Sequence, residues 1–322
     1  MHDLISRVFI RHFGNEILNH QSDSAIIPAD SLELAFTTDS FVIDPIFFPG
    51  GNIGKLAVCG TVNDLAVSGA EPRYLSASFI IEEGFPMKDL EIITRSMAEE
   101  ASKAGVYIVT GDTKVVNKGK CDKLFINTSG IGRLKAGGKI NGRTGNIKPG
   151  DVVIINGTLG DHGMAVMNAR ESFNFKTGIA SDCACLNELI REVLEKTRTV
   201  SFMRDPTRGG VATVLNELAG EISHGISLDE YALPVSSDVK AMCELLGYDP
   251  LYIANEGKVV IVAGRDEGNL ILEVMKGNRL GQNCAIIGTI VSEHPGKVVM
   301  KTQTGGNRII DFLTGEMLPR IC

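Results

Sequence analysis

The sequence predicts a two-domain protein in which helices and strands alternate, as in α/β or α+β folds. Three observations support this prediction. The chain has 322 residues, and a globular domain commonly contains about 150. Segments with the apolar period of a strand and of a helix follow one another along the chain. Residues 146–151 have the composition of a connector, with Pro149 followed by Gly150, so we expect the domain boundary there.

The first half shows the pattern of strands interrupted by two helices. Gly105 directly follows the second helical segment and is a typical helix stop. In the helix that begins at Lys55, the apolar side chains form one stripe, which places Asn63 and Asp64 on an expected polar face. The expected elements are a strand at 34–38, a helix from 55, a strand at 75–81, a helix at 87–104, and strands at 106–109 and 124–131.

The second half again alternates, and Pro206 is suited to the first turn of the helix expected after it. The expected elements are a strand at 152–155, helices at 186–195 and 211–219, and strands at 259–262, 286–291 and 298–301. We divide the chain into an N-terminal segment (1–33), a first domain (34–148), a second domain (149–302) and a tail (303–322).

Composition argues against several classes of protein. The formal net charge is -7, and no basic block offsets it, which argues against a general binder of nucleic acids or membrane surfaces. No apolar run reaches the about 18 residues of a membrane-spanning helix, and the N-terminus lacks the pattern of a secretory signal. We therefore expect a cytoplasmic protein.

The seven cysteines do not show the spacing of a zinc site. Cys183 and Cys185 are separated by one residue, which does not match the usual patterns. A structural zinc site is therefore not expected. Four others lie among apolar neighbours and are expected to be reduced core residues: Cys59, Cys121, Cys243 and Cys284.

Three aspartates stand where metal-binding carboxylates are common. Asp39 and Asp112 are each expected directly after an apolar strand, at the edge where ligand sites of layered α/β folds open. Asp64 lies on the expected polar helix face. Carboxylates with few histidines suit Mg²⁺, which prefers oxygen ligands. For any one aspartate alone, a turn or cap residue is the favoured explanation, and for the three together it is favoured only weakly.

Two glycine-containing loops suggest anion binding. The loop before Lys55 is not a Walker loop, because Pro49 replaces the first glycine and Leu56 follows the lysine. A helix N-terminus still attracts anions, so Lys55 is either a phosphate ligand or a solvated lysine. In the segment 204–210, Asp205 and Arg208 place opposite charges together, which suits a Mg²⁺–phosphate group or a local ion pair.

A thiol near the end of the chain is the third chemical feature. Cys322 follows Pro319, Arg320 and Ile321, and a thiol on a mobile tail can swing and transport a bound group. The neighbouring cation favours the reactive thiolate, which the adjacent α-carboxylate opposes. The alternative is a frayed end without function.

Together these segments resemble the HypE family of hydrogenase maturation factors. That family belongs to a superfamily with aminoimidazole ribonucleotide synthetase, selenophosphate synthetase and thiamine monophosphate kinase. The resemblance covers nearly the whole chain, and the Pro-Arg-Ile-Cys ending is specific to HypE. The matching segments are 38–40, 54–66, 111–114, 160–163, 204–210, 254–257 and 318–322.

The resemblance implies an α+β protein with an N-terminal ATP-binding domain that forms a homodimer, a C-terminal α/β domain and a mobile tail. It implies that the carbamoyltransferase HypF loads a carbamoyl group onto Cys322. ATP with Mg²⁺ then drives dehydration of this group to a thiocyanate. Cyanide passes to iron on the HypC–HypD complex, for a nickel–iron hydrogenase.

The resemblance also implies roles for individual residues. Cys322 and Glu256 are expected to be catalytic, Glu256 as the base, with Asn63 and His162 as orienting groups. The expected Mg²⁺ ligands are Asp39, Asp64, Asp112 and Asp205. The expected nucleotide-binding residues are Lys55, Asp64, Gly111, Asp112, Thr113, Lys114, Thr207 and Arg208.

One difference and two alternatives remain. Family members usually begin with His-Gly and Gly-Gly stretches that contribute to the phosphate site, whereas this sequence starts Met1-His2-Asp3-Leu4; without that loop, weaker ATP affinity is expected. The first alternative is a superfamily kinase or synthetase that acts on a free small molecule. The second is a nucleotide-gated scaffold that presents Cys322 to partners.

Overall fold

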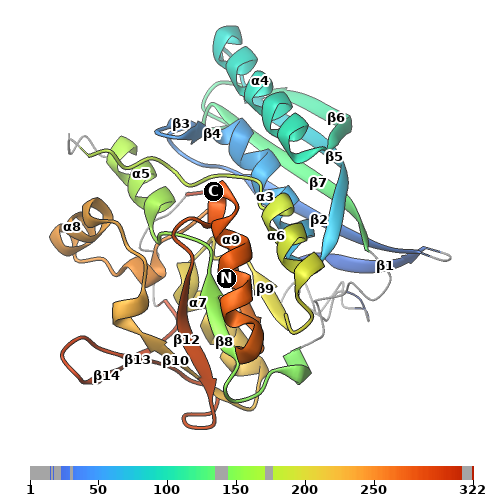
Figure 1. Ribbon diagram of the computed structural model, residues 1–322. Helices are drawn as coiled ribbons and strands as arrows, with labels where there is room; N and C mark the ends of the chain where they lie inside the picture. The colour runs from blue at the N-terminus through green and yellow to red at the C-terminus, as the bar shows by residue number, and fades with distance from the viewer. Residues whose placement is uncertain are drawn as a thin grey trace.

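The protein is described here by a computed structural model, shown in Figure 1. It describes residues 15, 17, 23–29, 32–134, 144–170, 177–313 and 321–322. The segment 1–14, where the N-terminal difference was noted, and residues Pro319 and Arg320 lie outside the described residues. The helices and strands of the described part form two layered halves, each built on its own sheet.

In the first half, helices α3 (Ile53–Val67) and α4 (Met87–Ala104) lie on one face of a sheet (Figure 1). They pack closely because Gly54 has no side chain: a Cβ there would lie 2.5 Å from the carbonyl oxygen of Ile93. No helix in the described part of the chain covers the opposite face of the sheet, here called the open face. In sheet order, the strands are β1 (Ala25–Ala29), β2 (Leu32–Phe41), β7 (Leu124–Leu134), β5 (Ala70–Glu82) and β6 (Tyr107–Val116).

Helix α3 is buried nearly all round, contrary to the expected polar face. The sheet covers one side of it, and α4 and the second half of the molecule cover the rest. Asn63 is only 1% exposed, and Asp64 is half-buried. The expectation was wrong because a helix between two domains has no solvent-facing side, so its polar residues serve internal contacts.

Strands β2 and β6 continue past the points where the sequence suggested that they end. Asp39 pairs with Thr128 inside the sheet, and Asp112 pairs with Ser78. Neither aspartate therefore follows its strand. The period of two simply continues in β2: Thr38 and Ser40 are exposed on the open face, whereas Asp39 lies on the helix-facing side with Phe41, whose ring is in the core.

The second half has helices on both faces of its sheet. Valine and isoleucine of the strand Val152–Ile155, labelled β8, alternate between two cores, with Val153 and Ile155 packed against helix α7 (Gly210–Glu221). Val152 and Ile154 pack against α6 (Asn187–Lys196) and α9 (Gly268–Lys276). The continuous apolar run of β8 follows from this two-sided burial. In sheet order, the strands are β14 (Asn307–Ile310), β13 (Val298–Lys301), β10 (Gly225–Asp229), β12 (Ala285–Val291), β8 (Val152–Ile155), β11 (Val260–Ala263) and β9 (Phe202–Arg204).

The remaining described elements lie near the site. Helices α5 (Asp161–Arg170) and α8 (Ser237–Leu246) pack against each other through a small apolar core. Strands β3 (Phe47–Phe48) and β4 (Gly51–Asn52) form a hairpin before α3. None of the helices in the described part of the chain is both long and apolar enough to cross a membrane.

Three boundaries differ from the sequence expectation. Strand β1 pairs with β2 although it precedes residue 34, and β14 pairs with β13 although it follows residue 302, so both sheets extend beyond the expected domain limits. Helix α7 begins at Gly210, and both Gly209 and Gly210 have positive φ. Pro206 therefore lies in the preceding loop and not in the first helical turn.

Candidate active site

Cys322 is docked between the two halves of the molecule. Its carbonyl oxygen accepts a hydrogen bond from the Val42 amide at 3.1 Å. The Ile321 carbonyl oxygen lies 2.9 Å from Nε2 of His162, and because a carbonyl only accepts, Nε2 carries the proton. The Ile321 side chain is buried. The end of the tail is thus tied to both halves of the protein.

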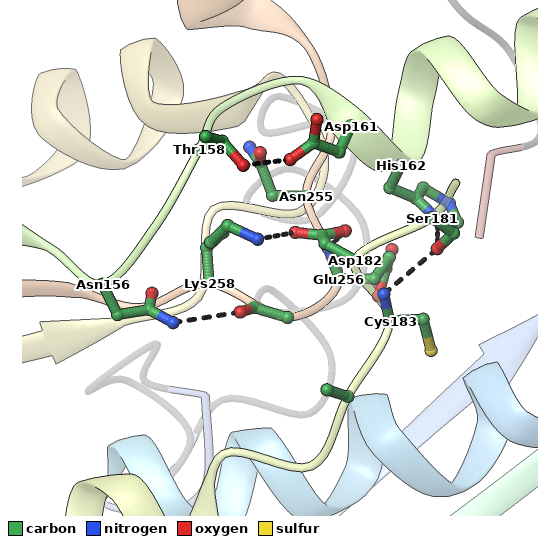
Figure 2. Close-up of polar contacts among 12 residues, drawn as sticks. Asn156, Thr158, Asp161, His162, Ser181, Asp182, Cys183, Asn255, Glu256 and Lys258 are labelled. Atoms are coloured by element: carbon green, nitrogen blue, oxygen red, sulfur yellow. Dashed lines mark hydrogen bonds and ion pairs between the residues drawn. The ribbon is translucent and has the colours of Figure 1, made fainter. Parts of the chain in front are cut away.

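His162 is held by a second contact on its other nitrogen. Burial lowers the pKa of His162, which favours the neutral ring, so Nδ1 accepts a hydrogen bond from the Ser181 hydroxyl at 2.7 Å (Figure 2). The ring also meets Phe48 edge-on, with centroids 5.5 Å apart. These contacts fix the orientation in which Nε2 faces the tail.

Burial makes the docked Cys322 thiol a weak acid. Burial raises the pKa of Cys322 to about 12, the nearby Glu256 carboxylate adds to this rise, and Arg208 opposes it. Among the described residues, the cation that lowers this pKa is Arg208, from the loop before α7; Arg320, which was expected from the sequence, lies outside the described residues. In the docked position the sulfur is protonated at neutral pH.

Glu256 is a buried carboxylate beside the tail. Its side chain is 3% exposed, and its Oε1 has no hydrogen-bond partner among the described residues. Burial is the first cause that raises the pKa of Glu256 well above its usual value, and negative neighbours including Asp205 add to it. A buried carboxyl oxygen without a partner is typical of a group that meets a ligand or a proton donor.

A buried ion pair holds the backbone of Glu256. The Glu256 amide donates to Oδ1 of Asp182 at 3.0 Å, and Oδ2 of Asp182 pairs with Nζ of Lys258 at 2.7 Å (Figure 2). The lysine lowers the pKa of Asp182 against the effect of burial. Gly257, between Glu256 and Lys258, allows its backbone to lie close to the backbone of Asp182, because a Cβ at this position would lie 1.9 Å from the Asp182 carbonyl oxygen.

Asn63 joins helix α3 to the same region. Its Nδ2 donates to the carbonyl oxygens of Ala184 at 3.1 Å and Glu256 at 3.3 Å. Its Oδ1 accepts from the Leu186 amide at 2.8 Å. From helix α3 of the first half, Asn63 therefore orients two backbone segments of the second half. It contacts the segment that contains Glu256 through backbone atoms only.

A group of aspartates forms the second part of the site. Burial is the largest cause that raises the pKa of Asp64, and repulsion from Asp205, Asp23 and Asp39 adds to it. The pKa of Asp205 rises to about 8, through burial and then through Asp23 and Asp39. These four carboxyls, of Asp23, Asp39, Asp64 and Asp205, repel one another where burial limits their contact with solvent. Since oxygen ligands attract a hard divalent cation, this group fits Mg²⁺.

Loop contacts bring the aspartates to the tail. The Pro206 carbonyl oxygen accepts from the Asn255 amide at 3.1 Å and from its Nδ2 at 3.2 Å. This places the loop of Asp205, Thr207 and Arg208 next to the segment of Glu256. Five sequence-predicted residues, Asp39, Asp205, Arg208, Glu256 and Cys322, are thus close enough to influence one another's charge.

Other predicted residues lie apart from this group. Asp112 forms an exposed ion pair with Lys114 at 2.8 Å, which is the first cause that lowers the pKa of Asp112. Gly111 and Thr113 line a groove of about 530 Å³ between α4 and strands β5 and β6. Asp112 was expected beside Asp39 and Asp64; in a single chain it is on the exposed edge strand instead.

Lys55 forms no ion pair with the described aspartates. Its Nζ donates to the Gly50 carbonyl oxygen at 3.0 Å. Two amides at the start of α3, those of Gly54 and Lys55, donate to Oδ1 of Asn52. The helix is therefore capped by its own Asn52, which occupies amides that an anion would need.

Sequence reasoning missed four residues of the site. Asp23 joins the aspartate group and forms an ion pair with Arg204 at 3.3 Å. Ser181, Asp182 and Lys258 support His162 and Glu256. Lys258 is two residues from Glu256, so a charged residue next to an expected buried carboxylate was an available signal. Asp182 and Ser181 lie in a segment without regular structure, and no sequence signal indicated their role.

Comparison with known protein families agrees with the two halves. Residues 21–134 match the N-terminal domain of AIR synthase related protein, and residues 148–301 match its C-terminal domain. A relative from Cupriavidus necator, named "Carbamoyl dehydratase HypE", is 48% identical over 321 residues, which cover 99% of this chain and 91% of the relative.

Two solved structures are similar over nearly the whole chain. One is a HypE–HypF complex, with a TM-score of 0.90 and 50% identity over 96% of this chain and 99% of that chain. The other is the hydrogenase maturation protein HypE in complex with ATP, with a TM-score of 0.86 and 45% identity over 100% of this chain and 96% of that chain. The chain belongs to the family of HypE carbamoyl dehydratases and contains both AIR synthase related domains.

Proposed function

We propose that this protein uses ATP to dehydrate an S-carbamoyl group on Cys322 to a thiocyanate, which supplies cyanide for nickel–iron hydrogenase maturation. The observation that supports it best is the docked position of Cys322, whose sulfur is influenced by Glu256, Arg208, Asp39 and Asp205 together. The proposed base and two of the proposed metal-binding carboxylates thus lie close enough to influence the charge of one sulfur. The relatives' name, carbamoyl dehydratase, supports a dehydration of a carbamoyl group.

The reaction needs an activated oxygen and a base. The oxygen of a carbamoyl group is a poor leaving group, so transfer of the γ-phosphoryl group of ATP to it makes phosphate the leaving group. The nitrogen must lose both of its protons as the C–N triple bond forms and phosphate departs. Glu256 is the proposed acceptor of these protons one at a time, with the first released to solvent before the second is taken, because burial raises its pKa above that of a free carboxyl.

The aspartate group is the proposed Mg²⁺ site. Asp39, Asp64 and Asp205, joined by Asp23, have the oxygen ligands and the mutual repulsion that a divalent cation relieves. Bound Mg²⁺ would neutralise phosphate charge during transfer. Arg208 lies beside Asp39 and the tail, and is the proposed cation for the transferred phosphoryl group, with Thr207 next to it.

His162 is proposed to position the loaded tail. Its Nε2–H holds the carbonyl oxygen of Ile321, one residue before the reactive sulfur. Asn63 is proposed to keep the Glu256 segment in register with helix α3 through the Glu256 carbonyl oxygen. Neither side chain needs to contact the carbamoyl group, so both are positioning residues.

We infer that the protein is a homodimer whose second copy completes the nucleotide site. The open face of the first sheet and its edge strand β6 expose large apolar side chains: Phe36, Tyr74, Ile80, Tyr107, Val109, Val115 and Ile131. An apolar surface of this kind marks an interface. The exposed strand β6 contains four of the predicted nucleotide-binding residues, Gly111, Asp112, Thr113 and Lys114. Association of two copies through this strand would bring these residues, and the loop before Lys55, towards a nucleotide.

The proposed partners can reach the sulfur only if the tail leaves its docked position between the two halves. A carbamoyltransferase of the HypF type must reach the sulfur, which is largely buried and protonated when docked. A HypC–HypD complex must later take the cyanide. The thiol therefore reacts with partners when released and returns to the aspartates and Glu256 for dehydration.

Intact-mass spectrometry tests the reaction. The full-length chain is incubated with a HypF-type carbamoyltransferase, carbamoyl phosphate and ATP. We expect a carbamoyl adduct on Cys322 that loses water only when Mg²⁺ is present. Cys322→Ala should show no adduct, Glu256→Gln should stop at the carbamoyl stage, and the exposed Glu83→Gln should react normally. Normal dehydration by Glu256→Gln would remove Glu256 from the role of base.

A further inference from the structure

We propose that Cys59, Glu100 and Cys185, here called the Cys59–Glu100–Cys185 cluster, bind a borderline-soft divalent cation of the Zn²⁺ type. The two sulfurs lie 3.5 Å apart, and the three ligand atoms all lie within 4.8 Å of one another. None of the three has a part in the proposed dehydration. The fold joins two cysteines that are far apart in sequence, which their spacing did not indicate.

The distances suit a tetrahedral zinc ion. Zinc–sulfur bonds are about 2.3 Å and zinc–oxygen bonds about 2.1 Å, so two sulfurs on one tetrahedral ion are about 3.8 Å apart. The sulfurs of Cys59 and Cys185 are already near this separation. Cys183, which is 2% exposed, also interacts with the Cys59 thiol, but its sulfur is not among the ligand atoms that all lie within 4.8 Å of one another.

The ligands lie on rigid parts of the fold. Cys59 is inside α3, and Glu100 is inside α4. Cys185 lies in the segment before α6, whose backbone is held on both sides by Asn63, through Ala184 and Leu186. The side chain of Asn187 also donates to the Ala104 carbonyl oxygen at 3.0 Å. A metal would need little rearrangement here, and it would join the second domain to both helices of the first.

The charges also balance. Two thiolates and one carboxylate contribute three negative charges, and a divalent cation contributes two positive ones. One negative charge remains, and it is balanced by Lys103, whose ammonium pairs with one oxygen of Glu100 at 2.7 Å. Each thiol gives up its proton to solvent on binding, so affinity should rise with pH, by up to about a hundredfold for each step of one in pH when two protons are released.

Cadmium and zinc titrations test the site in the full-length chain, with Cys322→Ala as background to remove the tail thiol. We expect one equivalent of Cd²⁺ to produce thiolate-to-metal absorption in the ultraviolet, and Zn²⁺ to be retained against a chromophoric chelator. Cys59→Ser or Cys185→Ser should weaken Zn²⁺ binding by about a hundredfold or more, and Glu100→Gln by about tenfold. Cys243→Ser and Cys284→Ser, buried cysteines outside the cluster, are the matched controls.

Folding of each variant is checked by circular dichroism. Should Cys59→Ser unfold, the result rests on Glu100→Gln, which preserves shape, and on Cys185→Ser, because Cys185 is only partly buried. Zn²⁺ should raise the melting temperature of the background protein and not that of Cys185→Ser. Absence of saturable absorption at one equivalent, or equal Zn²⁺ affinity in the background and Cys185→Ser, would overturn the proposal.

Discussion

Glu256 shows at the scale of one residue how a proposed function opposes stability. Its carboxyl is buried, and burial is the main cause of its raised pKa. The folded state therefore binds the Glu256 proton more tightly than the unfolded chain does. The contribution of this group to stability is present below the unfolded pKa of about 4.3 and is lost as the pH rises through the folded pKa.

Glu256→Gln is therefore expected to stabilise the fold at neutral and higher pH. The substitution removes a buried charge and retains the shape, and a tenfold difference in proton affinity between the folded and unfolded states corresponds to about 1.4 kcal/mol. The gain in the free energy of unfolding should be of the order of 1 kcal/mol or more at pH 8 and should shrink towards pH 4.5, as followed by urea unfolding. An equal gain at both pH values, or a gain also in Glu83→Gln, contradicts this explanation.

The docked tail is the element whose position decides the reactivity of the sulfur. Docking raises the pKa of Cys322 to about 12, whereas a free cysteine has a pKa of about 8.5. Docking is therefore stabilised by this group below about pH 8.5 and loses that stabilisation as the pH rises towards 12. Release of the tail both exposes the thiol and favours its ionisation.

His162→Ala should accelerate alkylation of Cys322 by iodoacetamide. Loss of the hydrogen bond to the Ile321 carbonyl oxygen removes about 0.5–1.5 kcal/mol from docking, which corresponds to about a two- to tenfold faster reaction. His162→Gln, which retains a donor, should restore part of the protection. Peptide mass spectrometry at pH 7 assigns the modified cysteine. Equal rates in all three proteins would show that His162 does not hold the tail.

The contact between α3 and α4 gives a second prediction at this scale. Gly54→Ala should lower the free energy of unfolding by about 1–3 kcal/mol, because the new Cβ would meet the Ile93 carbonyl oxygen. Gly220→Ala, at a helical position with open space around it, should raise it by about 0.5–1 kcal/mol. Urea unfolding of the two variants compares them directly. If the free energy of unfolding changed with the same sign in both variants, helix propensity and not the contact between α3 and α4 would decide the effect.

For the whole molecule, the open sheet face predicts self-association. Val115→Lys places a charge at a residue that is 68% exposed on β6, and should weaken the dimer at least tenfold in sedimentation velocity, because burying an unpaired charge is costly. Leu245→Lys, equally exposed at 68% but on α8 of the other half, should leave association unchanged. A monomeric parent protein at micromolar concentration would refute the dimer.

Local patterns were sufficient for most elements. Helix α4 and strands β8 and β13 have the bounds that periodicity and stop signals predicted. The patterns failed where tertiary contacts changed the setting of a residue. The Gly-Asp-Thr sequence at 111–113 has turn composition, yet pairing with β5 keeps it extended. Asn63 looked solvent-exposed because nothing local indicates that a second domain covers that side of α3.

The alternating fold, the family and the chemical types at the site all follow from the amino-acid sequence, because periodicity, glycine positions and short segments are local properties of the chain. Which of these groups meet depends on tertiary contacts. Folding joined Asp23 to the three other aspartates, separated Asp112 from them, and placed Cys185 against Cys59. It also made the Cys322 thiol a weak acid, since burial and the field of distant charges arise only when the chain has folded.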